Sequence, residues 1–254
     1  MQKIIDKYPE IISLVQFGSS ISGDTYFGSD VDMMIILKKR DKELEEKIQE
    51  EFDWEYQLHI HDETEFKESI EKREPLSLSI VHTGKVLKGE AFINTCRPYP
   101  PTDYTVKRCM FNSFAALGIG LSDFLYGMWS DATNSFYHAA RSSVWAILLQ
   151  KEVTPPNNKV FALLTDEEMR GLYKEIVEFR NNPFDMEPDY EIKDKLWNNR
   201  LDNDFSQLLN KVNLVIKKNY SIIFKKEIVN FFQIMEILRN KYSKPDFYYK
   251  KLRG

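Results

Sequence analysis

Two stretches decide the fold, Phe17-Gly18-Ser19 and Ser29-Asp30-Val31-Asp32. The first closes the apolar run of residues 11–17, and the second opens the apolar run of residues 33–37. Short apolar runs bounded by polar residues predict buried strands. Because side chains alternate along a strand, Asp30 and Asp32 are expected to project from one face where the second strand begins. Two carboxylates aimed at one point favour a bound cation, and oxygen ligands suit Mg²⁺.

The glycine and serine at positions 18 and 19 fall at a predicted strand-to-helix turn. Glycine lets the backbone approach a phosphate closely, and serine adds amide and hydroxyl donors. An Asp-x-Asp pair alone is common in solvated turns, so it predicts little by itself. Here both motifs stand at strand ends, where ligand sites gather in open α/β sheets. The combination predicts phosphoryl or nucleotidyl transfer.

The order Gly-Ser, loop, Asp-x-Asp resembles the signature of the nucleotidyltransferase superfamily, which has the polymerase-beta-like fold. The resemblance implies that Gly18, Ser19 and Ser29 bind the nucleotide. It implies that Asp30 and Asp32 are catalytic and hold Mg²⁺.

A third carboxylate on a neighbouring strand is also implied, where it completes the metal site or deprotonates the attacking hydroxyl. The alternating stretch of residues 53–61 predicts such a strand, and Glu55 lies on its polar face near its start. We therefore expect Glu55 to be the third catalytic and metal-binding residue, with Asp53 as the alternative. If the register places Gln57 opposite the two aspartates, the site has only two carboxylates, which leaves a catalytically weak or inactive site as an alternative.

Two histidines, His59 and His61, share the polar face of the same stretch. A zinc site built on them is disfavoured, because the chain has only four histidines and neither cysteine stands nearby. A role as a base or in substrate contact is left open.

Length and composition predict a two-domain protein of 254 residues, 43% hydrophobic. The net charge of −4 gives no overall attraction to nucleic acid, although a local basic patch is not excluded. The two cysteines, Cys96 and Cys109, are expected to be buried thiols in a reducing cytoplasm. No apolar run approaches the roughly 20 residues of a membrane span.

The first half of the chain alternates helix and strand, which predicts a small mixed sheet with helices on one face. Strands are expected at residues 11–17, 31–37 and 54–60 and within 82–89. Prolines 98, 100 and 101 interrupt the pattern, because proline continues neither a helix nor a central strand. We therefore predict an α+β chain, with a nucleotidyltransferase domain at residues 1–97 and an all-α helical bundle at residues 98–254. Helices of the bundle are expected at residues 104–129, 134–150, 165–180, 191–218 and 221–240.

The segment Tyr137-His138-Ala139-Ala140-Arg141 resembles a helix of the HEPN bundles that accompany minimal nucleotidyltransferases. Many HEPN domains are ribonucleases with a histidine four to six residues after an arginine. Neither Arg141 nor Arg180 is followed by such a histidine, so a nuclease is disfavoured. His138 and Arg141 are expected at the helix surface or in an interdomain contact, and the alternative has Arg141 facing the nucleotide.

The whole arrangement also resembles enzymes of the kanamycin nucleotidyltransferase type, in which the second domain forms a wall of the site, often across a dimer. We predict a cytoplasmic, Mg²⁺-dependent enzyme of the EC 2.7.7 class, with ATP binding expected. It moves a nucleoside monophosphate from a nucleoside triphosphate to an acceptor hydroxyl on a small molecule or protein and releases pyrophosphate. The alternative is a catalytically weak or inactive nucleotide-binding or protein-interaction module. It is favoured by Ser22, which stands where minimal members usually carry a phosphate-binding arginine. A homodimer is expected from the many apolar residues of the bundle.

Overall fold

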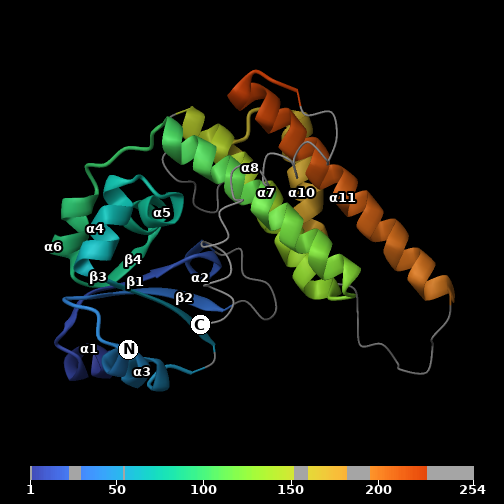
Figure 1. Cartoon of the computed structure of the whole chain (residues 1–254). Helices are drawn as coiled ribbons and strands as arrows, with labels where there is room; N and C mark the ends of the chain where they lie inside the picture. The colour runs from blue at the N-terminus through green and yellow to red at the C-terminus, as the bar shows by residue number, and fades with distance from the viewer. Residues whose placement is uncertain (1, 23–29, 54, 152–159, 182–194, 228–254) are drawn as a thin grey trace. The chain divides into compact units, whose positions relative to one another are not determined.

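The computed structural model describes residues 2–22, 30–53, 55–151, 160–181 and 195–227 (Figure 1). The chain divides into two compact units, one of residues 1–106 and 148–163, the other of residues 107–147 and 164–254. The elements of the first half are α1 (Gln2–Lys7), β1 (Ile11–Phe17), α2 (Ser19–Ser22), β2 (Val31–Leu37), α3 (Lys42–Glu50), β3 (Tyr56–Asp62), α4 (Glu63–Glu71), α5 (Pro75–Thr83), β4 (Lys85–Lys88) and α6 (Glu90–Cys96). Those that follow are α7 (Asp103–Leu125), α8 (Trp129–Gln150), α9 (Val160–Leu163), α10 (Glu167–Asn181) and α11 (Lys195–Phe224).

The first unit contains a four-stranded sheet in the order β3-β2-β1-β4. Strand β1 pairs antiparallel with β2 and with β4, whereas β2 and β3 run parallel. The sheet is therefore small and mixed, as predicted from the alternation of elements. Its register pairs Asp32 with Phe17 on one side and with Gln57 on the other.

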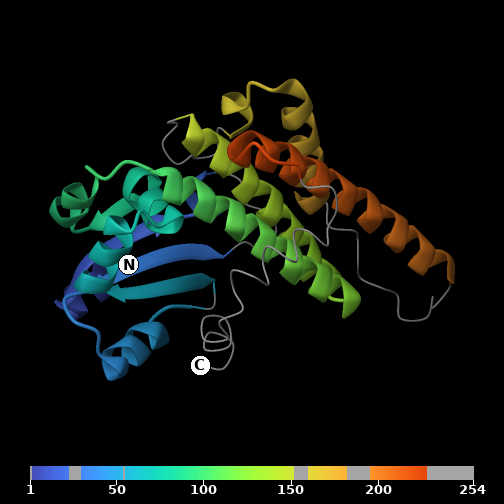
Figure 2. The ribbon, with the colours of Figure 1, turned by 45° about the horizontal axis from the view of Figure 1, so that its top comes forward.

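Helices cover both faces of this sheet, so the prediction of helices on one face was wrong (Figures 1 and 2). One face packs against α4, α5 and α6 through a buried cluster that includes Met34, Ile36 and Phe66. The opposite face, which carries Met33 and Ile35, packs against α1 and α3. Strand β2 is apolar on both faces because each face is covered, and this is typical of a central strand.

The ends of several elements follow from local chemistry. Asp62 caps α4, accepting a hydrogen bond from the Glu65 amide, while the Glu65 carboxylate accepts one from the Asp62 amide. This reciprocal capping box ends β3 and starts α4. Strand β3 begins at Tyr56 and extends to Asp62, two residues later at each end than expected. The short helix α6 was not predicted.

The proline-rich segment is anchored on the turn between α4 and α5. The Arg73 guanidinium lies 4.3 Å from the centroid of the Tyr99 ring. The Thr105 hydroxyl donates to the Arg73 carbonyl at 3.0 Å, and the Tyr104 hydroxyl donates to Glu74 at 2.7 Å. These contacts explain why the first compact unit extends to residue 106. The domain boundary at residues 97 and 98 stays a prediction.

The second unit contains α10, α11 and most of α7 and α8, and helices in this part of the chain are predicted by the sequence pattern. One correction concerns α11, which continues through residues 218–221, where we expected a break between two helices. Asn219 is buried there and donates to the Ser143 hydroxyl at 2.8 Å, so burial and this bond support the helix. The later part of the helix expected at residues 221–240 lies outside the described residues.

The chain itself buries most of the apolar side chains from which we expected a second subunit. Phe111, Phe114, Leu117, Phe136 and Leu148 are buried, whereas Leu125 is 81% exposed. The homodimer therefore stays a prediction.

Two further expectations concern the thiols and membranes. Cys96 and Cys109 are free and buried, as predicted. Burial raises the pKa of the Cys96 thiol. Within the part of the chain that the structure describes, no helix has the length and apolar character needed to cross a membrane.

Candidate active site

The backbone of Gly18 and the side chain of Asp32 lie very close together at the edge of the sheet. Gly18 follows β1 directly and has a φ of +77°, in the left-handed region that glycine adopts without strain. A Cβ atom at this position would lie 2.0 Å from Oδ2 of Asp32 and 2.9 Å from its Cγ. Only glycine therefore allows the backbone turn and the Asp32 carboxylate to lie so close together.

The carboxylate of Asp32 is held at this place by the strand register. Asp32 is the second residue of β2 and pairs with Phe17, the last residue of β1. Its side chain is 23% exposed, so the group is positioned by the sheet and still accessible to a ligand. The structure thus brings Gly18 and Asp32 close together, and their roles stay predictions.

His59, for which the sequence leaves a role as a base or in substrate contact open, lies beside Asp32. Nε2 of His59 is 3.9 Å from Oδ1 of Asp32, and the His59 side chain is 31% exposed. The His59 ring also packs against Phe17, with 5.3 Å between the ring centroids. The sequence placed His59 on the polar face of β3, but its nearness to Asp32 depends on the parallel pairing of β2 and β3.

The other two predicted carboxylates lie at the beginning of their strands. Asp30 is exposed and precedes β2 by one residue. Glu55 is exposed and precedes β3, and its carbonyl accepts a hydrogen bond from the Val31 amide at 2.7 Å. Among the described residues, no three His, Cys, Asp or Glu side chains gather as a metal-binding group. The roles of Asp30 and Glu55 stay predictions.

The serines of the predicted site are only partly covered by the structure. Ser19 is the first residue of α2, whereas Ser29 lies outside the described residues. The following residue, Ser20, donates its hydroxyl to the Phe17 carbonyl at 3.2 Å and accepts a hydrogen bond from Nε2 of the Gln16 side chain at 3.1 Å. These bonds fix the turn that carries Gly18, and the sequence analysis did not foresee them.

The donors at this edge fit the metal that the resemblance implies. Asp30 and Asp32 offer carboxylate oxygens, which Mg²⁺ prefers and usually supplements with water and substrate phosphate. The missing side chain of Gly18 leaves the backbone open directly beside the Asp32 carboxylate. A triphosphate and its metal ion have suitable donors and acceptors here.

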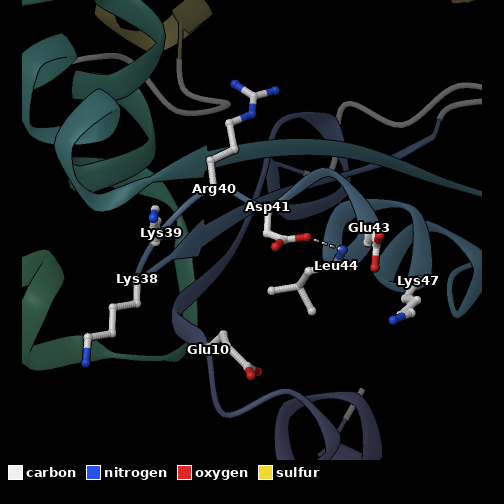
Figure 3. A pocket seen from close by; sticks show the side chains of 8 residues that line it. All are labelled: Glu10, Lys38, Lys39, Arg40, Asp41, Glu43, Leu44 and Lys47. Atoms are coloured by element: carbon white, nitrogen blue, oxygen red, sulfur yellow. Dashed lines mark hydrogen bonds between the residues drawn. The ribbon is translucent and has the colours of Figure 1, made fainter.

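A hollow lies at the opposite end of β2, beside the start of α3 (Figure 3). The hollow is lined by both basic and acidic side chains, namely Glu10, Lys38, Lys39, Arg40, Asp41, Glu43 and Lys47, together with Leu44. Arg40 is bound by Glu45 and Glu65, and the Asp41 carboxylate accepts from the Leu44 amide. Because cations and carboxylates are nearly balanced, this hollow has no strong preference for an anion or a cation.

The helical unit contains a polar group around His138 in α8. The Arg180 guanidinium lies 4.0 Å from the centroid of the Tyr137 ring, and its Nε donates to Asn134 at 3.1 Å. Burial, followed by the charges of Arg141 and Arg180, lowers the pKa of His138 to about 3. His138 is therefore neutral at physiological pH and lies mostly inside the helical unit.

Among comparisons with known proteins, a match to a family model covers the part of the chain that contains Gly18 and Asp32. No curated protein matches the chain. A crystal structure at 1.90 Å resolution of a nucleotidyltransferase-like protein from Exiguobacterium sibiricum shares 14% identity with a TM-score of 0.39, over 98% of this chain and 90% of that one. Residues 1–91 match the family model described as polymerase beta, nucleotidyltransferase. The N-terminal part of the chain is therefore a nucleotidyltransferase domain of the polymerase beta family, followed by a helical region.

Proposed function

We propose that the protein transfers a nucleoside monophosphate from a nucleoside triphosphate such as ATP to an acceptor hydroxyl and releases pyrophosphate. The acceptor is a small hydroxylated molecule or a protein side chain. The observation that carries this proposal is the contact of Gly18 with Asp32, which joins a phosphate-compatible turn to a positioned carboxylate. The match of residues 1–91 to nucleotidyltransferases supports it.

In this proposal, the turn at Gly18 and Ser19 binds the triphosphate. Ser29, which directly precedes Asp30 in the sequence, also binds the nucleotide. Asp30 and Asp32 would hold Mg²⁺, and the ion would supply positive charge to neutralise the phosphates. The protein contributes mainly by positioning the acceptor in line with the leaving pyrophosphate. Glu55 is the proposed base that removes the proton from the acceptor hydroxyl.

The experiment is a pyrophosphate-release assay with a panel of nucleoside triphosphates and acceptors, in the presence of Mg²⁺. Asp30→Asn and Asp32→Asn each remove one metal-binding charge, and we expect a loss of at least about 100-fold in turnover. Glu43→Gln is the matched control, since it removes an exposed carboxylate beside the other end of β2. Full turnover in both asparagine variants contradicts the assignment.

The third carboxylate has its own test. If Glu55 acts in the transition state, Glu55→Gln lowers turnover by about 100-fold or more and leaves triphosphate affinity nearly unchanged. Wild-type turnover in this variant moves the role to Asp53 or to the helical region.

A second candidate function is nucleotide binding with weak or absent catalysis. The observation that favours it is the register, which pairs Asp32 with Gln57 rather than with a carboxylate. This candidate predicts that wild-type protein binds a nucleoside triphosphate in calorimetry but releases no pyrophosphate with any acceptor of the panel. Pyrophosphate release that depends on Asp32 excludes it.

A further inference from the structure

The parallel pairing of β2 and β3 brings a nitrogen donor to the edge that carries Asp32. Gln57 pairs with Asp32, and His59 lies two residues further along β3 on the same face of the sheet. Nε2 of His59 is 3.9 Å from Oδ1 of Asp32. The two side chains come from strands that are separated in sequence by the whole of α3.

This separation is short enough for one metal ion to contact both atoms. Bonds from a divalent transition metal to a carboxylate oxygen or an imidazole nitrogen are about 2.1 Å long. Two such bonds at a right angle span about 3.0 Å, so small rotations of the two side chains bring the atoms from 3.9 Å to the distance of neighbouring metal ligands. Both strands can therefore keep their positions when a metal binds.

The His59 ring is also held in place and reachable. Phe17 is buried and packs against the ring, which limits the orientations of the imidazole. At the same time 31% of the His59 side chain is exposed, so solvent and ligands have access. His61 lies two residues beyond His59 and pairs with Ile36, further from Asp32 along the sheet.

We propose that Asp32 and His59 together bind a divalent metal ion, and that this mixed oxygen and nitrogen pair makes the site prefer a transition metal such as Mn²⁺ to Mg²⁺. The inference rests on the proposed function for its biological use, since the metal would then meet the triphosphate. Imidazole binds transition metals well, whereas Mg²⁺ prefers oxygen ligands alone. Water and phosphate oxygens complete the coordination.

The experiment measures metal binding to the full chain without any nucleotide. Electron paramagnetic resonance follows the loss of the free Mn²⁺ signal, and Mg²⁺ is then added to displace the bound ion. We expect wild-type protein to hold Mn²⁺ against at least a tenfold excess of Mg²⁺, as an order of magnitude for one nitrogen ligand. His59→Ala is expected to weaken Mn²⁺ binding by about 10- to 100-fold and to change Mg²⁺ binding far less.

Two further variants make the result specific. His59→Asp restores an all-oxygen pair, so we expect it to bind metal again with the preference shifted toward Mg²⁺. His61→Ala is the matched control from the same strand and face, and we expect Mn²⁺ binding within about twofold of wild type. Thermal unfolding of each variant checks that it is folded.

The outcomes separate this inference from the proposed function. Equal Mn²⁺ binding by wild type and His59→Ala overturns the inference, as does equal loss in His59→Ala and His61→Ala. Binding of Mn²⁺ that depends on His59 supports it, even if no pyrophosphate is released and the proposed function fails.

Discussion

Two groups of polar side chains in the described part of the chain differ in what surrounds them. At the sheet edge, Asp32 and His59 are 23% and 31% exposed. In the helical unit, Arg180 is only 8% exposed and is bound by Tyr137 and Asn134. Buried polar groups need partners within the protein, whereas a site must keep donors and acceptors open to a ligand. This difference favours the sheet edge as the proposed catalytic site and a structural role for the group around Arg180.

The largest expected effect comes from Gly18→Ala at the sheet edge. The new Cβ would lie 2.0 Å from Oδ2 of Asp32, so the turn or the carboxylate must move. A displacement of about 1 Å at a reacting centre costs about 100-fold, and we expect at least this loss of pyrophosphate release. The positive φ adds strain of roughly 1–3 kcal/mol to the folded state.

Gly171→Ala is the control for this change, because a Cβ at Gly171 meets no atom within 4 Å. Gly171 lies within α10, where alanine stabilises a helix by roughly 0.5–1 kcal/mol relative to glycine. Unchanged turnover is expected. If Gly18→Ala is as active as Gly171→Ala, the close contact with Asp32 has no part in catalysis.

The second effect, on stability, comes from Arg180→Ala in the helical unit. The substitution removes the buried aliphatic part of the side chain, the contact with the Tyr137 ring and the hydrogen bond to Asn134. We expect the free energy of unfolding to fall by roughly 2–4 kcal/mol. Chemical denaturation measures the loss. Arg170→Ala on the same helix removes only an exposed pair with Glu167 and is expected to cost less than about 0.5 kcal/mol. Similar costs for the two variants would remove the distinction between the two polar groups.

Part of the site and of the fold can be predicted from the sequence alone. The sequence indicates Gly18 and Asp32 as site residues because each stands at the end of a predicted strand, and the structure places them close together. The contact of Asp32 with His59 was not found, because it depends on which strands are neighbours and on their register. Similarly, the apolar run of β2 indicates burial but not that helices cover both faces. Helix α6 was missed because it is short, from Glu90 to Cys96.

A smaller effect is expected in the pH dependence of stability. The pKa of His138 is about 3 in the folded protein and about 6.5 in an unfolded chain. Above pH 6.5 both states are neutral at this residue, so its contribution to stability is fully present. As the pH falls from about 6.5 toward 3, only the unfolded state takes up the proton, and the free energy of unfolding drops by about 1.4 kcal/mol per pH unit.

His138→Gln removes this group and leaves the other titrating groups in place. We expect the free energy of unfolding of the wild type to fall more steeply than that of the variant between pH 6.5 and pH 5. Urea denaturation at several pH values within this range measures the difference. If the free energies of unfolding of wild type and His138→Gln change in parallel with pH, His138 has the same pKa in the folded and unfolded states and is not buried.

The central claim is that the edge formed by Gly18 and Asp32 carries out nucleotidyl transfer. Its most direct test follows a label from the α-phosphate of a nucleoside triphosphate into the acceptor, with wild type, Asp32→Asn and the control Glu43→Gln side by side. The account predicts labelled product with wild type and Glu43→Gln, and at least about 100-fold less with a folded Asp32→Asn variant. Equal labelling by Asp32→Asn and wild type would contradict it.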